Sequence, residues 1–134
     1  MNGPAGQPHV VALCGSLRAE SRTRIALTEV LDAARAAGAT ADLLDLRDYD
    51  LPGLDPDAEA VADAETLCRE VAAADSVALG TPNYHGSVSG VLKNALDYCG
   101  RDEFAGTTVG LLEVAAGQHP GRPLSHLRTI GRTL

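Results

Sequence analysis

The chain has 134 residues, of which 45% are hydrophobic and 22% are charged, proportions typical of one soluble globular domain. Its formal net charge of −7 argues against nucleic-acid binding, because affinity for a nucleic-acid backbone depends on a broad basic surface. No apolar run is long enough to cross a bilayer, and the first residues lack the features of a signal peptide, so we expect a cytoplasmic protein with no membrane partner.

The first part of the chain predicts a leader, a strand and a helix. Residues 1–8 are polar and predict a flexible leader, which leaves a single domain over residues 9–134. The valine-rich run 9–14 is typical of a buried parallel strand. A helix is expected from about Ser21, a residue type that caps helices, to Gly38, a residue type that ends them.

The rest of the chain continues this alternation. Residues 41–46 predict a second strand, and residues 47–57, rich in Pro, Gly and Asp, predict a surface loop. Then follow a helix over residues 57–74, a strand over 76–80, a helix over 88–98, a strand over 107–114 and a helix from residue 122. Apolar strands that alternate with helices predict an α/β fold whose parallel sheet is covered on both faces. Because ligands bind beyond the carboxyl ends of such strands, the loops after the first, third and fourth strands are the candidate site.

The cysteines and histidines do not predict a metal or redox site. Cys14, Cys68 and Cys99 lie far apart in the sequence, form no C-x-x-C pair and imply no disulfide framework. Each falls in or at the end of a predicted element, which favours small buried side chains over reactive thiols. The four histidines have no metal-ligand spacing, so we expect no metal.

The loop after the first strand is basic, although the chain is acidic. Residues 16–24 hold three arginines and one glutamate, a local charge of +2. Ser16, Ser21 and Thr23 add short hydroxyl donors, and the start of the following helix adds free N–H groups and the positive end of its dipole. This combination suits a phosphate group, but neither G-x-G-x-x-G nor a Walker pattern is present. A solvated first helical turn with an ordinary N-cap is the alternative interpretation.

The loop after the third strand, "TPNYHGS" (residues 81–87), suits a planar ligand. Pro82 stiffens the turn, and Gly86 permits close approach of the backbone. His85 is expected to shape the loop through hydrogen bonds rather than to donate a proton.

Together, "GSLRAES" after the first strand and "TPNYHGSVSGVLKNALD" after the third resemble the NADPH-dependent FMN reductase family, over residues 9–134. These are flavodoxin-like flavoproteins that include quinone, chromate and azo-dye reductases. The resemblance implies a flavodoxin-like three-layer sandwich with a parallel sheet of strand order 2-1-3-4. It also implies a C-terminally shortened chain, which lacks the last strand and helix of the family.

The resemblance also implies which residues bind FMN. The FMN phosphate would be held by Ser16, Arg18, Ser21 and Thr23. One side of the isoalloxazine ring would be lined by Pro82, Asn83, Tyr84, His85 and Gly86. Ala116 and Gly117, after the fourth strand, would close the site. No catalytic side chain is implied, because the flavin itself accepts hydride from NADPH or NADH and passes electrons to a small-molecule acceptor.

Two other functions remain open from the sequence. A flavodoxin-type electron carrier is disfavoured because the chain lacks a Thr-rich phosphate loop and has only three Tyr, one Phe and no Trp. A degenerate, non-catalytic interaction module is the second alternative. Residues 92–97 resemble a family helix that often packs against a partner subunit, which suggests a homodimer, although an amphipathic core helix is an equally good interpretation.

Overall fold

The computed structural model describes residues 6–117 and 120–134 of the chain. Its parallel sheet has the order β2-β1-β3-β4, with the strands β1 His9–Cys14, β2 Thr40–Asp45, β3 Ser76–Pro82 and β4 Thr108–Val114. The helices are α1 Arg22–Ala36, α2 Ala62–Ala72, α3 Gly90–Tyr98, α4 Arg101–Phe104 and α5 Arg122–Gly131, and Leu46–Asp48 form one 3-10 turn, η1. The α/β fold and the strand order predicted from the sequence are confirmed.

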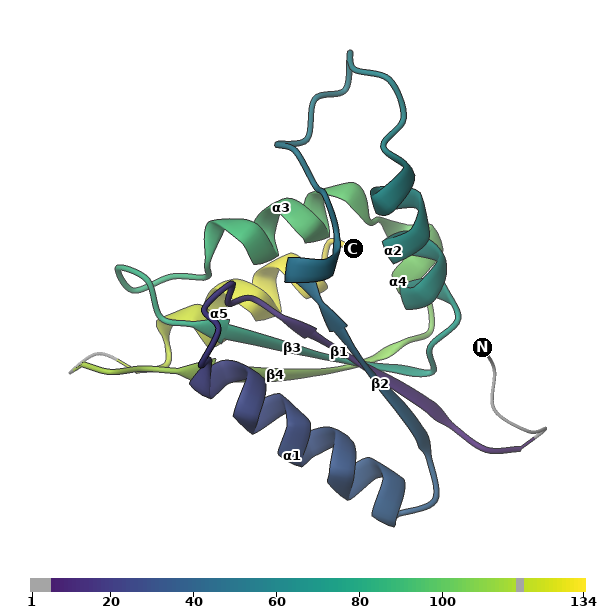
Figure 1. The fold of residues 1–134 in the computed structure, drawn as a ribbon, viewed down its shortest axis with the longest axis vertical. Coiled ribbons are helices and arrows are strands. Elements are labelled where there is room, and N and C mark those ends of the chain that lie inside the picture. Colours follow the sequence, from purple (N-terminus) through teal and green to yellow (C-terminus); the bar gives the residue numbers. More distant parts are fainter. Residues whose placement is uncertain (1–5, 118–119) are drawn as a thin grey trace.

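The sheet is the middle one of three layers (Figure 1). On one face, Leu27 and Leu31 of α1 pack against the small residues Ala12 and Ala78 of β1 and β3. On the other face, leucines and valines of α2, α3 and α5 form a larger core cluster with β1 and β3. None of the described helices is long and apolar enough to cross a membrane.

Gly15 and Gly80 allow close packing where the loop after β1 meets the sheet. A Cβ atom at Gly80 would lie 2.6 Å from Leu27 Cδ1, so glycine is what allows α1 to pack directly on β3. A Cβ atom at Gly15 would lie 2.8 Å from Ser89 Oγ, and the Gly15 N–H donates to Gly80 O at 2.7 Å. The loop after β1 is therefore held close to the end of β3 and the start of α3.

The start of α2 was predicted wrongly. The helix begins at Ala62 instead of near residue 57, because residues 55–58 form a turn, with Ala58 N donating to Asp55 O at 3.1 Å, and Val61 at the N-cap is extended. The preceding residues form an exposed loop that is attached to α3: Leu54 N donates to Asn94 Oδ1 at 2.9 Å, and Asn94 Nδ2 donates to Pro52 O at 3.0 Å. The short elements α4 and η1 were not predicted at all.

The first described residues are attached to the turn between α1 and β2. Gln7 Nε2 donates to Gly38 O at 2.7 Å, and Pro8 O accepts from Thr40 N at 2.9 Å. Residues 1–5 of the predicted flexible leader lie outside the described residues.

β4 is an edge strand of the described sheet. It pairs with β3 along its whole length, and no other described strand pairs with it. Its apolar residues Leu111, Leu112 and Val114 are only partly buried. Val109 and Leu111 also form, with α5, a groove of about 370 Å³.

Candidate functional site

A cavity of about 500 Å³ opens at the carboxyl ends of β1, β3 and β4. It is lined by Ser16, Arg18, Glu20, Ser21, Arg22 and Thr23 after β1, by Pro82, Asn83 and Tyr84 at the end of β3, and by Val114, Ala115 and Ala116 at the end of β4. The structure thus brings together eight of the eleven residues predicted to form the site. Small-molecule sites usually enclose about 300–1,000 Å³, so the cavity has the size of such a site.

The hydroxyl groups of the first loop are fixed by backbone hydrogen bonds. Ser16 is buried, and its Oγ accepts from Arg18 N at 3.3 Å. Ser21 is the N-cap of α1, and its Oγ accepts from Arg24 N at 3.1 Å. A hydroxyl that accepts in this way still has its own proton to donate. The two serines are therefore positioned to donate to a ligand in the cavity.

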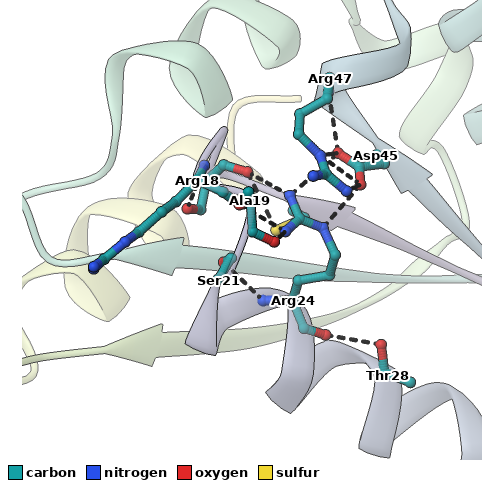
Figure 2. Close-up of polar contacts among 9 residues, drawn as sticks. Arg18, Ala19, Ser21, Arg24, Thr28, Asp45 and Arg47 are labelled. Atoms are coloured by element: carbon teal, nitrogen blue, oxygen red, sulfur yellow. Dashed lines mark hydrogen bonds and ion pairs between the residues drawn. The ribbon is translucent and has the colours of Figure 1, made fainter.

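The start of α1 adds positive potential to the same wall. No acidic residue lies in the first turn of this helix, so its N–H groups and dipole are not offset by a carboxylate within that turn. Thr23 lies in this turn and is 2% exposed. Arg18 is exposed, and Figure 2 shows its side chain directed away from Asp45. The wall offers hydrogen-bond donors and an exposed cation, which together suit an anion.

Arg24, the third arginine of the basic loop, does not line the cavity. Its Nε donates to Asp45 Oδ2 at 2.8 Å, and Arg47 Nη2 donates to the same oxygen at 2.7 Å (Figure 2). Burial acts to raise the pKa of Asp45, but hydrogen bonds from Arg47 and Arg24 outweigh it and lower this pKa to about 2. The cavity wall is left with two arginines and one glutamate, a charge of +1 instead of the +2 counted along the sequence.

The loop after β3 forms a tight turn whose base faces the cavity. Tyr84 and Ser87 exchange two backbone hydrogen bonds of 3.1 Å, and Asn83 Oδ1 accepts from Gly86 N at 2.9 Å. The central residues His85 and Gly86 have φ angles of 55° and 78°, and positive φ at both positions is what a type I′ turn requires. Tyr84 is 52% exposed at the cavity wall.

His85, Gly86 and Gly117 are the predicted site residues that the structure does not place in the cavity wall. His85 and Gly86 form the tip of the turn, where their positive φ angles fix its shape. The nearest atom to a Cβ at Gly86 would be Arg122 Cδ at 3.6 Å, and Ser87 Oγ lies 2.7 Å from His126 Nδ1. The turn is therefore supported by α5, which sequence spacing does not reveal.

The sequence interpretation missed Glu20, Arg22, Val114 and Ala115 as lining residues. Val114 and Ala115 come at the end of β4, so the rule that ligands lie beyond the carboxyl ends of strands would have found them. Glu20 and Arg22 were counted in the charge of the basic loop, but the family resemblance assigned neither of them to the phosphate.

Comparison with known proteins decides the family. The sequence model for NADPH-dependent FMN reductase matches residues 8–134. The chain belongs to this family. FMN-dependent NADPH-azoreductases of Staphylococcus aureus are 38% identical to this chain over 127 residues, which is 94% of its length. The chain spans about 63% of the length of these curated relatives.

Solved structures show the same architecture. An oxidoreductase from Corynebacterium diphtheriae has a TM-score of 0.77 at 20% identity, over 96% of this chain and 77% of that protein. The NAD(P)H:(acceptor) oxidoreductase FerB from Paracoccus denitrificans has a TM-score of 0.73 at 24% identity, over 93% of this chain and 71% of that protein. At these identities the likeness shows the fold alone, and it agrees with the flavodoxin-like fold predicted from the sequence.

Proposed function

We propose that this chain binds FMN and acts as an NAD(P)H-dependent oxidoreductase, which passes electrons from NADPH or NADH to a small-molecule acceptor. The observation that carries the proposal is the cavity, which combines a donor-rich wall at the start of α1 with a wall built by the Tyr84 turn. Family membership and the names of the Staphylococcus aureus relatives support the choice of FMN and of a nicotinamide.

The residues present fit the phosphate of FMN. In the proposal, Ser16, Ser21 and Thr23 donate hydrogen bonds from side chains held by burial or capping, and Arg18 supplies the charge. A charge-assisted hydrogen bond is about twice as strong as a neutral one, so Arg18 would contribute more than each hydroxyl. Only Glu20 among the lining residues opposes an anion, and it is exposed to solvent.

The remaining walls fit a planar ring. Pro82, Asn83 and Tyr84 would border one side of the flavin, and the small side chains of Ala115 and Ala116 would leave room beside it. His85 and Gly86 would act indirectly by fixing the turn, and Gly117 would extend the wall that Ala116 begins. FMN would supply the hydride and electron chemistry, and this chain would bind and orient it while leaving one ring face open.

The proposal specifies the electron acceptor only by its chemical class. The relatives are named for azo-compound reduction, and azo compounds, quinones and free flavin are all small acceptors that an open ring face can reach. The proposal also includes a cytoplasmic location. The proposal further includes a homodimer formed through α3 and the loop before α2 that is attached to it. It is supported by the family resemblance of residues 92–97 and by Leu54 on that loop, which is 44% exposed.

The experiment is a titration of the purified chain with FMN, followed by addition of NADPH or NADH without oxygen. Bound FMN that is bleached by a nicotinamide supports the proposed reductase. Bound FMN that neither nicotinamide bleaches would favour the electron carrier, and failure to bind flavin would favour the interaction module.

A further inference from the structure

Arg24 lies behind the loop that follows β1, and it holds that loop by its carbonyl groups. Arg24 Nη2 donates to Ser16 O at 2.9 Å, and Nη1 donates to Arg18 O at 2.8 Å and to Ala19 O at 3.4 Å. Figure 2 shows the contacts with the Arg18 and Ala19 carbonyl groups converging on one guanidinium group. One largely buried side chain therefore binds three of the four carbonyl groups of residues 16–19.

This arrangement affects what the loop can bind. Carbonyl oxygens carry partial negative charge and repel an anion, whereas N–H and hydroxyl groups attract it. Because three carbonyl groups of residues 16–19 accept from Arg24, they are directed towards the guanidinium and away from the cavity. The loop's donors are left for the cavity side, where Ser16 and Arg18 lie.

Asp45 fixes Arg24 in place. The Arg24 and Asp45 side chains are 13% and 8% exposed, and they form a two-point contact of 2.8 Å and 3.4 Å. Asp45 is the last residue of β2 and is also held by Arg47. The loop after β1 is in this way anchored to the neighbouring strand, although Asp45 itself does not line the cavity.

We propose that Arg24, held by Asp45, is a positioning residue that gives the loop of residues 16–19 the shape needed to bind a phosphate group. This inference rests on the proposed function for its ligand, the phosphate of FMN. Arg24 acts through the backbone of the loop and not by contact with the phosphate, since it lies outside the cavity wall.

The test compares Arg24→Lys and Arg24→Gln with Arg128→Gln, a control that removes an equal charge from the exposed face of α5. Lysine keeps the charge but lacks the planar fork that binds several acceptors at once. We expect both Arg24 variants to weaken FMN binding about tenfold or more, riboflavin binding to change less than about threefold, and the control to match the wild type. If Arg24→Lys binds FMN like the wild type, only charge matters and the proposal is wrong.

Hydrogen exchange of residues 16–19 without any ligand provides a second readout. We expect faster exchange in Arg24→Gln than in the wild type, and equal exchange would overturn the proposal. If the wild type binds no FMN, the proposed function fails, and the hydrogen-exchange comparison alone decides whether Arg24 shapes the loop. Should Arg24→Gln not fold, the double variant Arg24→Gln/Asp45→Asn replaces it, because that variant buries no unpaired charge.

A second inference concerns two cysteines on the far side of the same fold. Cys68 of α2 lies 3.9 Å, sulfur to sulfur, from Cys99, which follows α3. Cys68 also lines a separate cavity of about 490 Å³ beneath the loop of residues 52–61, so a small oxidant can reach it. The sequence interpretation treated these cysteines as isolated buried side chains, and their pairing corrects that view.

We infer that Cys68 and Cys99 are a site of reversible oxidation by peroxide-type oxidants. Cys68 loses its proton, and the thiolate attacks one oxygen of hydrogen peroxide. The O–O bond breaks, Cys68 becomes a sulfenic acid, and the hydroxide that leaves takes up the proton to form water. The Cys99 sulfur then attacks the Cys68 sulfur and displaces a second water. Two thiols lose two electrons and two protons, the peroxide is reduced to two waters, and one disulfide forms.

Mass spectrometry of peroxide-treated protein tests this inference. We expect the intact mass to fall by two hydrogens and a non-reducing digest to join the two cysteine peptides, both reversed by a thiol reductant. Burial raises the pKa of both thiols, so the reaction should be faster at higher pH. Cys68→Ser and Cys99→Ser should lose the mass change, whereas Cys14→Ser, at the buried third cysteine, should keep it. Oxygen addition without a linked peptide in the wild type would overturn the inference.

Discussion

Replacing Asp45 by asparagine should destabilise the fold, because it removes the counter-charge of Arg24, which is largely buried. The pKa of Asp45 falls from 3.8 to about 2 in the folded protein. At about 1.4 kcal/mol for each pKa unit, this shift contributes roughly 2.5 kcal/mol to stability at neutral pH. Breaking a buried ion pair from one side typically costs about 3–5 kcal/mol, so we expect a loss of that order in the free energy of unfolding.

The pH dependence of this loss gives the sharper test. A carboxyl whose folded-state pKa is lowered stabilises the protein above its unfolded pKa, and this contribution is lost as the pH falls through the folded pKa. For Asp45 the window runs from about 4 down to about 2. Urea unfolding of the wild type and Asp45→Asn should therefore differ by a constant amount above about pH 5, and about half of the pKa-linked part should disappear by pH 3.

The matched control is Asp97→Asn on α3. Asp97 pairs with Lys93, but these side chains are 39% and 47% exposed, and an exposed pair contributes less than about 1 kcal/mol. The reasoning is refuted if the gap between the wild type and Asp45→Asn is the same at pH 7 and pH 3. It is also refuted if Asp97→Asn costs as much as Asp45→Asn.

Three further substitutions test the site and its support. Arg18→Ala should weaken FMN binding about tenfold or more and riboflavin binding much less, since a charge-assisted hydrogen bond is worth about 1.5–3 kcal/mol; equal losses in the two titrations would contradict its role. Gly86→Val should lower the free energy of unfolding by about 1–3 kcal/mol, because a φ of 78° is strained for a residue with a branched side chain. It should also lower nicotinamide-dependent flavin reduction while circular dichroism stays unchanged, and full turnover would show that the turn is not needed. Gly80→Ala should destabilise by about 1–3 kcal/mol through overlap with Leu27, whereas Gly110→Ala, which meets nothing within 4 Å, should not; equal thermal midpoints would disprove the close packing of α1.

The α/β architecture and the position of the cavity could be predicted because they depend on local signals, whereas the strand order was implied by the family resemblance. Apolar runs of strand length alternate with helical spacing along the chain, and parallel strands bring their carboxyl ends to one edge of the sheet. Ser21 follows from the chemistry of a helix start, where a hydroxyl caps an N–H group, and Ser16 and Thr23 lie near it in the same loop and first turn. Each of these inferences needs only residues that are close in sequence.

The features that could not be predicted depend on contacts between distant residues. From the sequence alone, Arg24 is interpreted as one more cation of the first loop, because its partner Asp45 is 21 positions away at the end of β2. Cys68 and Cys99 are 31 positions apart, and only the packing of α2 beside the end of α3 brings their sulfurs together. The position of His85 at the tip of a turn depends on the Tyr84–Ser87 pairing, which residue types alone do not specify.

The edge of β4 that no other described strand covers would offer a route to self-association distinct from the proposed homodimer through α3. An edge strand presents unpaired N–H and C=O groups that can extend the sheet into a neighbouring molecule. Two copies joined there would share backbone hydrogen bonds and would enclose Leu112 and Val114, which are only partly buried in one copy. Such a pair would form more readily at high protein concentration and would leave the α3 surface free. Cross-links that map to β4 would identify it, and cross-links that map to α3 would identify the proposed homodimer.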